Sequence, residues 1–264
     1  MTDPGPRDGS LLSRTFIGRW LKRYREYAQL CVTPGFIPHT SRPVRLLARV
    51  ILRIWLFLQV GRLRVIGAEN LNAPGRLVFC PNHGSMFDFV AYLLMHHRTH
   101  YMGAYEEMSG IWGLKGIVMG AVGCFPVDRS NGKTVLGPAT QLLVSGRNVL
   151  LFPEGHISAS GEFLPFKKGA AYIANGAYDQ LGGKERVGIV PVHIRYHRRD
   201  PATAAIDNYL KMGFKWRHGV TVTVCKPIWL HELSSRNPEE IMASVRAALM
   251  EQECASRAQA AGKR

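Results

Sequence analysis

The 264-residue chain lacks any run of about 18 residues that is both apolar and free of charge. A run of about that length is the minimum for a helix that crosses a bilayer, so we expect no simple transmembrane helix. The N-terminal segment also lacks a long apolar core, and we therefore expect no cleaved signal peptide.

Paired cysteines are absent as well. The five cysteines are scattered and form no Cys-x-x-Cys pair: Cys31, Cys80, Cys124, Cys225 and Cys254. This spacing disfavours a zinc site or a disulfide framework and indicates reduced thiols in a cytosolic setting. The sequence also lacks a P-loop and a dinucleotide-binding glycine motif. Because the histidines show no metal-ligand spacing either, we expect neither a metal ion nor a cofactor.

Acidic residues are scarce relative to basic ones. The chain contains 34 Lys and Arg but 19 Asp and Glu, which gives a net charge of +15. Residues 1–64 carry twelve basic and three acidic residues. An excess of this sign predicts an anionic partner, either a nucleic acid or an anionic membrane surface. Because no helix-turn-helix, zinc-finger or RNP-type pattern accompanies the charge, we expect the membrane surface and no nucleic acid.

Two amphipathic helices are predicted in this basic region. Within residues 10–30, apolar and aromatic side chains recur every three or four positions and share one face. Within residues 44–60, Arg45, Arg49 and Arg53 form a basic stripe. The wide apolar face of that second helix holds Leu46, Leu47, Val50, Ile51, Ile54, Trp55 and Leu58. Such helices are typical of the bilayer interface, where arginines reach the headgroups; a helical hairpin packed on the domain is the alternative.

The pattern changes at about residue 62. Short apolar, β-branched runs lie at 76–80, 148–152, 187–194 and 220–225, separated by helix-length stretches that include 88–97, 132–146 and 167–179. This alternation predicts an α/β fold with a mixed, largely parallel sheet flanked by helices. A final helix is predicted to have Asn237 as its N-cap and Pro238 as its first residue. We therefore expect an α/β domain over residues 62–264, preceded by the basic helix pair within residues 1–61.

Polar motifs follow two of the predicted strands. The segment "PNHGSMFD" follows the run at 76–80, and "PEGH" follows the run at 148–152. Ligands of open α/β sheets bind at the carboxyl ends of strands, so we expect the two motifs to meet there.

The first motif contains His83 and Asp88. On a continuous helix, residues five positions apart are separated by about 500° and do not share a face. In a strand-to-helix turn, however, Asp88 can hold one ring nitrogen of His83 and leave the other to remove a proton from an alcohol. Ser85 lacks the strained turn of a G-x-S-x-G nucleophile, and we interpret it as a turn residue.

Several segments resemble the glycerolipid acyltransferases, the lysophospholipid acyltransferase-like family that includes 1-acylglycerol-3-phosphate acyltransferase. "NHGSMFD" matches the Asn-His-x-x-x-x-Asp pattern of that family. "GCFPVDR" (Gly123–Arg129) resembles its second motif, "FPEGH" (Phe152–His156) its third, and "FKKGA" (Phe166–Ala170) and "IVPV" (Ile189–Val192) the segments that follow. The motifs occur in the same order and with matching spacing over roughly residues 65–230.

The resemblance implies an α/β sandwich on the cytoplasmic membrane face, with the N-terminal helices at the bilayer. It implies an O-acyltransferase that joins a fatty acyl group from acyl-CoA or acyl-carrier protein to the hydroxyl of a lysolipid, foremost 1-acylglycerol-3-phosphate. His83 and Asp88 would be catalytic, without an acyl-enzyme, and residues 116–127 would line an acyl channel or pack in the core. The substrate-binding residues implied are Asn82, Gly123, Arg129, Glu154, Gly155 and Lys167.

One departure from the family pattern concerns the acceptor. The third motif has His156 and Ile157 where the family has Thr-Arg, so one guanidinium for the acceptor's phosphate is missing. Lys167 and Lys168 are candidates to replace it. A lysolipid with another head group, such as a lyso-aminolipid, is therefore an alternative acceptor. Alternative functions are a thioesterase or lipase-like hydrolase that uses the same His–Asp pair, and a non-catalytic lipid-binding protein.

Overall fold

The computed structural model describes residues 16–85, 88, 91, 94, 98–109, 113–158, 162–197 and 219–261. Two predicted helices fall partly outside these described residues. They are the first six positions of the helix at 10–30 and most of the helix at 88–97.

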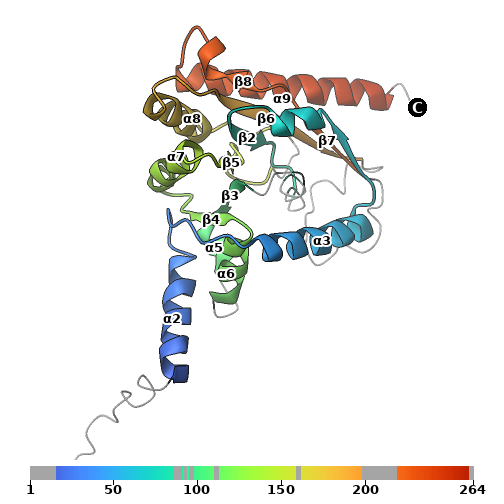
Figure 1. Ribbon diagram of the computed structural model, residues 1–264. Coiled ribbons are helices and arrows are strands. Elements are labelled where there is room, and N and C mark those ends of the chain that lie inside the picture. Colours follow the sequence, from blue (N-terminus) through green and yellow to red (C-terminus); the bar gives the residue numbers. More distant parts are fainter. Residues whose placement is uncertain are drawn as a thin grey trace, which may run out of the picture.

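A mixed sheet of eight strands forms the centre of the described part of the chain (Figure 1). The strands are β1 (Leu63–Ile66), β2 (Arg76–Pro81), β3 (Thr99–Ala104), β4 (Cys124–Val127), β5 (Asn148–Leu150), β6 (Val187–Tyr196), β7 (Val220–Val224) and β8 (Ile228–Trp229). Their order is β1-β7-β6-β2-β5-β3-β4, with β8 paired to β6. Because β7 and β8 run antiparallel to β6 and the other pairs are parallel, the predicted mixed, largely parallel sheet is confirmed.

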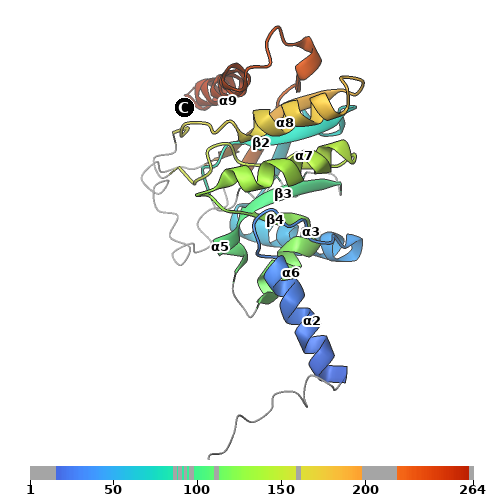
Figure 2. The same cartoon turned by 90° about the vertical axis from the view of Figure 1, so that its left-hand side faces the viewer.

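Helices cover both faces of this sheet (Figures 1 and 2). The α-helices of the described residues are α2 (Phe16–Leu30), α3 (Arg42–Gln59), α5 (Tyr105–Met108), α6 (Leu114–Ala121), α7 (Leu136–Val144), α8 (Gly169–Gln180) and α9 (Pro238–Ala261). Short 3₁₀ segments lie at η1 (Ala68–Asn72), η4 (Gly132–Val135) and η7 (Leu230–Glu232). One apolar core lies between the sheet and α7, α8 and α9, and a second lies on the opposite face, under α3.

The start of α9 agrees with its sequence signals. The side-chain oxygen of Asn237 accepts a hydrogen bond from the backbone N–H of Glu239 at 3.0 Å. Pro238 is the first residue of the helix, where its missing N–H costs nothing, and Glu239 and Glu240 lie in the first turn. The predicted N-cap is therefore confirmed.

The orientation of α3 differs from the prediction that its arginines reach solvent or headgroups. Arg45 is only 3% exposed and faces the domain, so for this residue the prediction is wrong. The cause lies in Gly123, whose φ is +103°: a Cβ added there would lie 2.2 Å from Nη2 of Arg45. The guanidinium thus occupies space that the absence of a side chain leaves. Arg49 is half-buried and Arg53 is exposed.

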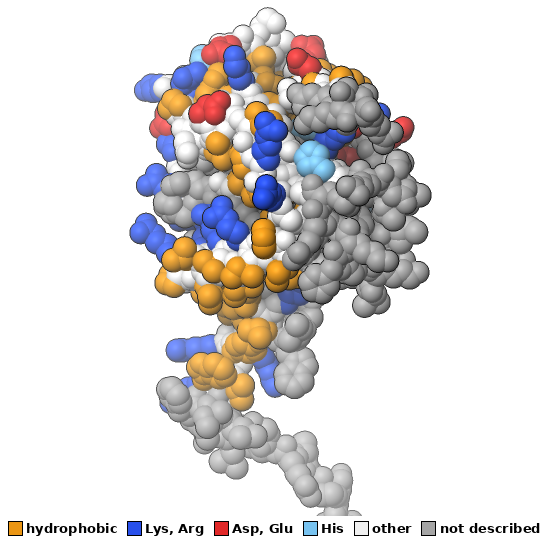
Figure 3. Space-filling view, turned by 90° about the vertical axis from the view of Figure 1, so that its right-hand side faces the viewer, with side chains coloured by type: hydrophobic (Ala, Val, Ile, Leu, Met, Phe, Trp, Pro, Cys, Tyr) orange, Lys and Arg blue, Asp and Glu red, His pale blue; other side chains and the backbone are white. Residues whose placement is uncertain are grey.

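The outward face of α3 is apolar. Val44, Ala48, Leu52 and Leu56 pack toward the core, whereas six other large side chains of the helix are about half exposed or more. These six, named here the α3 outer face, are Leu46, Leu47, Val50, Ile51, Ile54 and Phe57. Figure 3 shows apolar side chains gathered along the lower edge of the body, from which α2 projects. Among the described helices, none has both the length and the apolar character needed to cross a membrane.

Candidate active site

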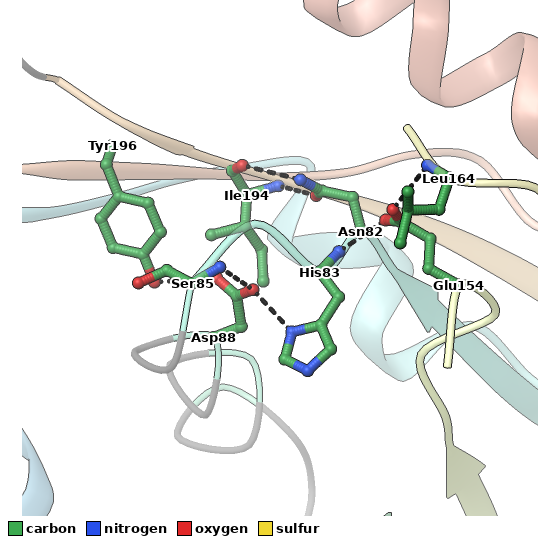
Figure 4. Close-up of polar contacts among 8 residues, drawn as sticks. All are labelled: Asn82, His83, Ser85, Asp88, Glu154, Leu164, Ile194 and Tyr196. Carbon is green, nitrogen blue, oxygen red and sulfur yellow. Dashed lines mark hydrogen bonds and ion pairs between the residues drawn. The ribbon is translucent and has the colours of Figure 1, made fainter. Parts of the chain in front are cut away.

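His83 and Asp88 form a hydrogen-bonded pair just beyond the carboxyl end of β2 (Figure 4). Nδ1 of His83 lies 2.9 Å from Oδ2 of Asp88. The intervening turn is closed in both directions, because the Ser85 N–H donates to Oδ2 of Asp88 at 2.9 Å and the Asp88 N–H donates to the Ser85 carbonyl at 3.2 Å. The turn brings the imidazole back to the carboxylate, as the sequence predicts.

The pair leaves one imidazole nitrogen available. An ionised carboxylate only accepts hydrogen bonds, so we assign the ring proton to Nδ1 of His83. Nε2 then carries the free lone pair that a general base requires. The His83 ring stacks on Phe152 with 4.1 Å between ring centroids, and Asp88 is 1% exposed. The protein therefore fixes both the tautomer and the ring plane.

Glu154 of the "PEGH" motif holds the backbone of the "PNHGSMFD" motif. Oε1 accepts the His83 N–H at 2.7 Å, and Oε2 accepts the Leu164 N–H at 2.8 Å. Burial raises the pKa of the Glu154 carboxyl, and the two backbone donors act against that rise. The Ser158 N–H also donates to the His83 carbonyl at 2.9 Å. The two post-strand motifs meet as the sequence predicts, since β2 and β5 are parallel neighbours.

Asn82 ties the same turn to β6. Its side-chain NH₂ donates to the Ile194 carbonyl at 3.1 Å, and its side-chain oxygen accepts the Ile194 N–H at 2.6 Å. The amide therefore bridges β2 and β6 beyond the last residues that their ladder pairs, Pro81 and Val192. This arrangement gives Asn82 a scaffolding contact, and its predicted role in substrate binding stays a prediction.

Tyr196 is a site residue that sequence reasoning missed. Its hydroxyl donates to Oδ1 of Asp88 at 2.9 Å (Figure 4). The predicted strand ended at residue 194, whereas β6 continues to Tyr196 and carries the phenol to the carboxylate. An aromatic residue in phase with the strand, two positions past Ile194, was the signal available in the sequence.

A cavity of about 690 Å³ opens beside the His83–Asp88 pair. Its walls are largely apolar, and the residues come from α3, β3, α6 and the segments after β4 and β5. Apolar lining side chains include Ala48, Ile51, Leu52, Met102, Val118, Met119, Val122, Leu136, Phe152 and Ile157. Val118, Met119, Val122 and Val127 belong to the stretch predicted to line an acyl channel or pack in the core, and they line this cavity.

Two of the predicted acceptor-site cations line the cavity, Arg129 and Lys167. Gly155 also lines it, and its φ of +74° brings its Cα close to Lys167: an added Cβ would lie 2.9 Å from Nζ. Asp128, beside Arg129, accepts hydrogen bonds from the Ser130 N–H at 2.8 Å and its hydroxyl at 2.6 Å, which lower the pKa of the Asp128 carboxyl. Those bonds shape the loop that presents Arg129.

The other predicted acceptor-site groups lie elsewhere. Lys168 pairs with Glu239 at the start of α9, and that hydrogen bond raises the pKa of Lys168. Lys168 is thus committed to a helix contact outside the cavity lining of the described residues. Gly123 lies at the amino end of β4 against Arg45, whereas Val127 and Arg129 at the carboxyl end line the cavity. Neither Lys168 nor Gly123 therefore lies where contact with substrate is favoured. Within the described residues, Asn82 and Glu154 do not line the cavity either.

Comparisons with known proteins identify similar sequences and a similar fold. A family model described as Acyltransferase matches residues 62–195. The chain is 29% identical over 133 residues to a 1-acyl-sn-glycerol-3-phosphate acyltransferase of Chlamydomonas reinhardtii. It is 30% identical over 132 residues to a chloroplastic 1-acyl-sn-glycerol-3-phosphate acyltransferase of Brassica napus. These matches cover 50% and 48% of the chain but only 38% and 35% of the two relatives.

A solved structure extends the similarity of fold to almost the whole chain. The crystal structure of the 1-acyl-sn-glycerophosphate acyltransferase PlsC from Thermotoga maritima matches with a TM-score of 0.52 and 20% sequence identity. The match covers 92% of this chain and 88% of that one. At this identity the similarity supports the fold alone, and it agrees with the mixed sheet and N-terminal helices described above.

Proposed function

The chain belongs to the Acyltransferase family, and from this premise we propose that it transfers a fatty acyl group from an acyl thioester to the hydroxyl of a lysolipid. One observation carries the proposal: the His83–Asp88 pair lies beside a largely apolar cavity of about 690 Å³ that also holds two cationic side chains. An apolar wall suits acyl chains, and the cations suit an anionic head group.

In the proposed reaction His83 acts as the general base. Nε2 takes the proton from the acceptor hydroxyl while Asp88 stabilises the imidazolium that forms. The alkoxide oxygen attacks the thioester carbonyl, a C–O bond forms, and the C–S bond then breaks as the tetrahedral intermediate collapses. The proton held by His83 passes to the departing thiolate. Acyl-CoA and acyl-carrier protein both supply the required thioester, and no further cofactor enters the reaction.

Burial of Ser85 supports direct transfer without an acyl-enzyme. The residue is 0% exposed, and its backbone N–H is bonded to Asp88. Within the described residues Ser85 does not line the cavity. A nucleophile must reach the thioester carbon, so the reacting hydroxyl in this proposal belongs to the lipid acceptor.

We propose 1-acylglycerol-3-phosphate as the acceptor, because Arg129 and Lys167 both line the cavity and can share its phosphate. Ile157 also lines the cavity, at the position where the family pattern has an arginine, and this observation favours a head group of lower charge. A lyso-aminolipid is therefore the second candidate acceptor.

We also propose that the protein works at a membrane surface, on its cytoplasmic face. The α3 outer face is apolar and exposed, and the N-terminal region carries much of the positive charge. Ile51 and Val118 are exposed and line the cavity at the same time. An acyl chain can thus pass between the bilayer and the cavity along continuous apolar surface.

The proposal is tested by acyl transfer in vesicles, with radiolabelled acyl-CoA and acyl-carrier protein each crossed against a panel of lysolipids. We expect diacyl product with phosphate-bearing acceptors and none from His83→Gln. Faster product formation from lyso-aminolipids would move the assignment to the second acceptor. Release of free fatty acid without acylated lipid would show a hydrolase, and absence of turnover with every donor would contradict enzymatic function.

A further inference from the structure

Tyr196 contacts the Asp88 oxygen that His83 does not use. Its hydroxyl donates to Oδ1 at 2.9 Å, whereas Oδ2 accepts from the His83 ring and the Ser85 backbone (Figure 4). Asp88 is 1% exposed, so protein donors replace the water that would otherwise solvate the carboxylate. A carboxylate in this environment depends on each of its hydrogen bonds.

We propose that Tyr196 is a positioning residue for the His83 base and that it acts through Asp88. The inference rests on the proposed function, in which His83 deprotonates the acceptor hydroxyl. Tyr196 is not among the described residues that line the cavity, so its effect on the reaction passes through the carboxylate.

The first part of this effect is geometric. A carboxylate held by donors on one oxygen can turn about its Cβ–Cγ bond, whereas donors on both oxygens fix its plane. The plane of Asp88 in turn sets the direction of the His83 ring, because Nδ1 follows Oδ2. Catalytic groups must lie within a fraction of an ångström of the productive geometry, so the phenol contributes to the rate and not to substrate binding.

The strand that carries Tyr196 is itself held in place. Tyr196 pairs with Val220 across the antiparallel β6–β7 ladder, and two residues earlier the Ile194 backbone is bonded by the Asn82 side chain. The strand that carries the phenol is therefore held by β7 on one side and by the Asn82 side chain of the His83 turn on the other. This gives the Tyr196–Asp88 contact a rigid base.

The second part of the effect is electrostatic. The phenol O–H withdraws negative charge from the carboxylate that faces the imidazole. Without the hydroxyl, the full carboxylate charge would stabilise the His83 imidazolium more strongly, and the neutral base would persist only at higher pH. Glu154 is the other carboxyl group bonded at His83, through the backbone N–H. The other charged residues that line the cavity are Glu107, Asp128, Arg129 and Lys167. A substitution at Tyr196 leaves these four residues and Glu154 unchanged.

The test is Tyr196→Phe, which removes only the hydroxyl. We expect kcat for acyl transfer to fall about tenfold, as for loss of one hydrogen bond to a charged group, while the acceptor KM changes less than about twofold. The acid limb of the kcat/KM profile should move to higher pH, and the melting temperature should change by only a few degrees. Tyr172→Phe is the matched control, because Tyr172 lies on α8 and its side chain is 49% exposed.

A second variant tests the electrostatic part without removing the phenol. Site-specific 3-fluorotyrosine at position 196 is a stronger hydrogen-bond donor of nearly the same shape, so the acid limb should move the opposite way, to lower pH. An unchanged kcat and pH profile in Tyr196→Phe would overturn the inference. So would a loss of activity that follows a large fall in melting temperature with the pH profile unchanged.

Failure of the proposed function gives a different result. If His83→Gln keeps its transfer activity, His83 is not the base and the premise fails. If His83→Gln is inactive while both Tyr196 variants behave like the wild type, the premise stands and only the role of Tyr196 is rejected.

Discussion

The turn that holds His83 and the α3 outer face show opposite relations between side chains and their surroundings. In the turn, buried polar groups are bonded from several directions: both Glu154 oxygens, both Asp88 oxygens and the Asn82 amide all have protein partners. On the α3 outer face, large apolar side chains lie open, and Leu46 and Leu47 are 67% and 61% exposed.

The contrast shows which part of the molecule is complete by itself. Buried polar groups cost free energy unless they are paired, and the described turn pairs them within the chain. Contiguous exposed apolar surface is also unfavourable in water, and in the proposed function the bilayer covers it. In that proposal the turn carries out the chemistry, and the helix face places it at the membrane surface.

The strongest test of the self-contained turn is His83→Gln. We expect acyl transfer to fall by about 10³-fold, because removing a positioned general base typically costs 10²- to 10⁴-fold. The melting temperature should stay within a few degrees of the wild type, since Glu154 bonds the backbone of residue 83 and not its ring. The measurement is transfer rate and thermal unfolding on the same preparation; a variant with more than about a tenth of the wild-type rate would contradict the base assignment.

The other side of the comparison is tested by Leu47→Glu combined with Ile54→Glu. Both side chains are more than half exposed and neither lines the cavity. Loss of their burial in lipid, at about 1.5 kcal/mol each, should weaken binding to anionic phospholipid vesicles about 100-fold.

Vesicle flotation measures this binding, and turnover of short-chain substrates in solution shows whether the site still works. Met250→Glu on α9 is the control, because Met250 is 47% exposed but lies far along the chain from α3. Equal flotation of the double variant and the wild type would show that the α3 outer face does not bind the membrane.

The sequence predicts the His83 turn better than it predicts the packing of α3 and the full set of strands. The His83–Asp88 pair and its meeting with the "PEGH" motif were predictable, because both follow strands whose apolar runs are unmistakable. β3 and β4 were missed since one contains Thr99, His100 and Gly103 and the other a proline, which hide the apolar pattern. Tyr196 was missed because its partner Asp88 lies 108 positions away in sequence.

The inward turn of Arg45 was not predictable for a related reason. Helical periodicity defines faces, but it does not say which of two apolar faces packs on the sheet. The inward face of α3 includes Arg45, and Gly123, which lies outside the helix, leaves room for its guanidinium. Long-range fit of this kind is invisible in a local pattern.

A smaller effect is expected for Arg129→Ala, which asks whether the cavity recognises phosphate. Loss of a charge-assisted hydrogen bond should lower kcat/KM about 10- to 100-fold for phosphate-bearing lysolipids. Neutral acceptors should lose less than about threefold, since they make no such bond. Lys168→Ala is the matched control, because that lysine pairs with Glu239 and does not line the cavity. Equal losses for charged and neutral acceptors would exclude phosphate recognition by Arg129.

The smallest expected effect concerns the polar contact between β6 and α9. It asks whether the pairing of buried polar groups seen in the His83 turn continues to that side of the sheet. His193 precedes Ile194 in β6 and is 2% exposed. Its Nε2 atom lies 3.0 Å from Oε2 of Glu253 on α9. The hydrogen bond from His193, together with Arg257, lowers the pKa of Glu253 to about 2 although partial burial opposes the shift. An unfolded glutamate has a pKa of about 4.3. A lowered carboxyl pKa means that this stabilisation is complete above about pH 5 and is lost as pH falls toward about 2.

Glu253→Gln should therefore lower the melting temperature by about 5 °C at pH 7, as expected for loss of about 2 kcal/mol. The difference from the wild type should shrink progressively as pH falls from about 5 toward 2, because the unfolded wild-type carboxyl then binds a proton that the folded carboxylate, with its lowered pKa, does not. Glu239→Gln on the same helix removes an exposed ion pair and should shift the melting temperature much less. Thermal unfolding of the three proteins between pH 3 and 7 measures both effects. A difference between Glu253→Gln and the wild type that stays constant over this range would show that the negative charge of Glu253 does not stabilise the contact of α9 with β6.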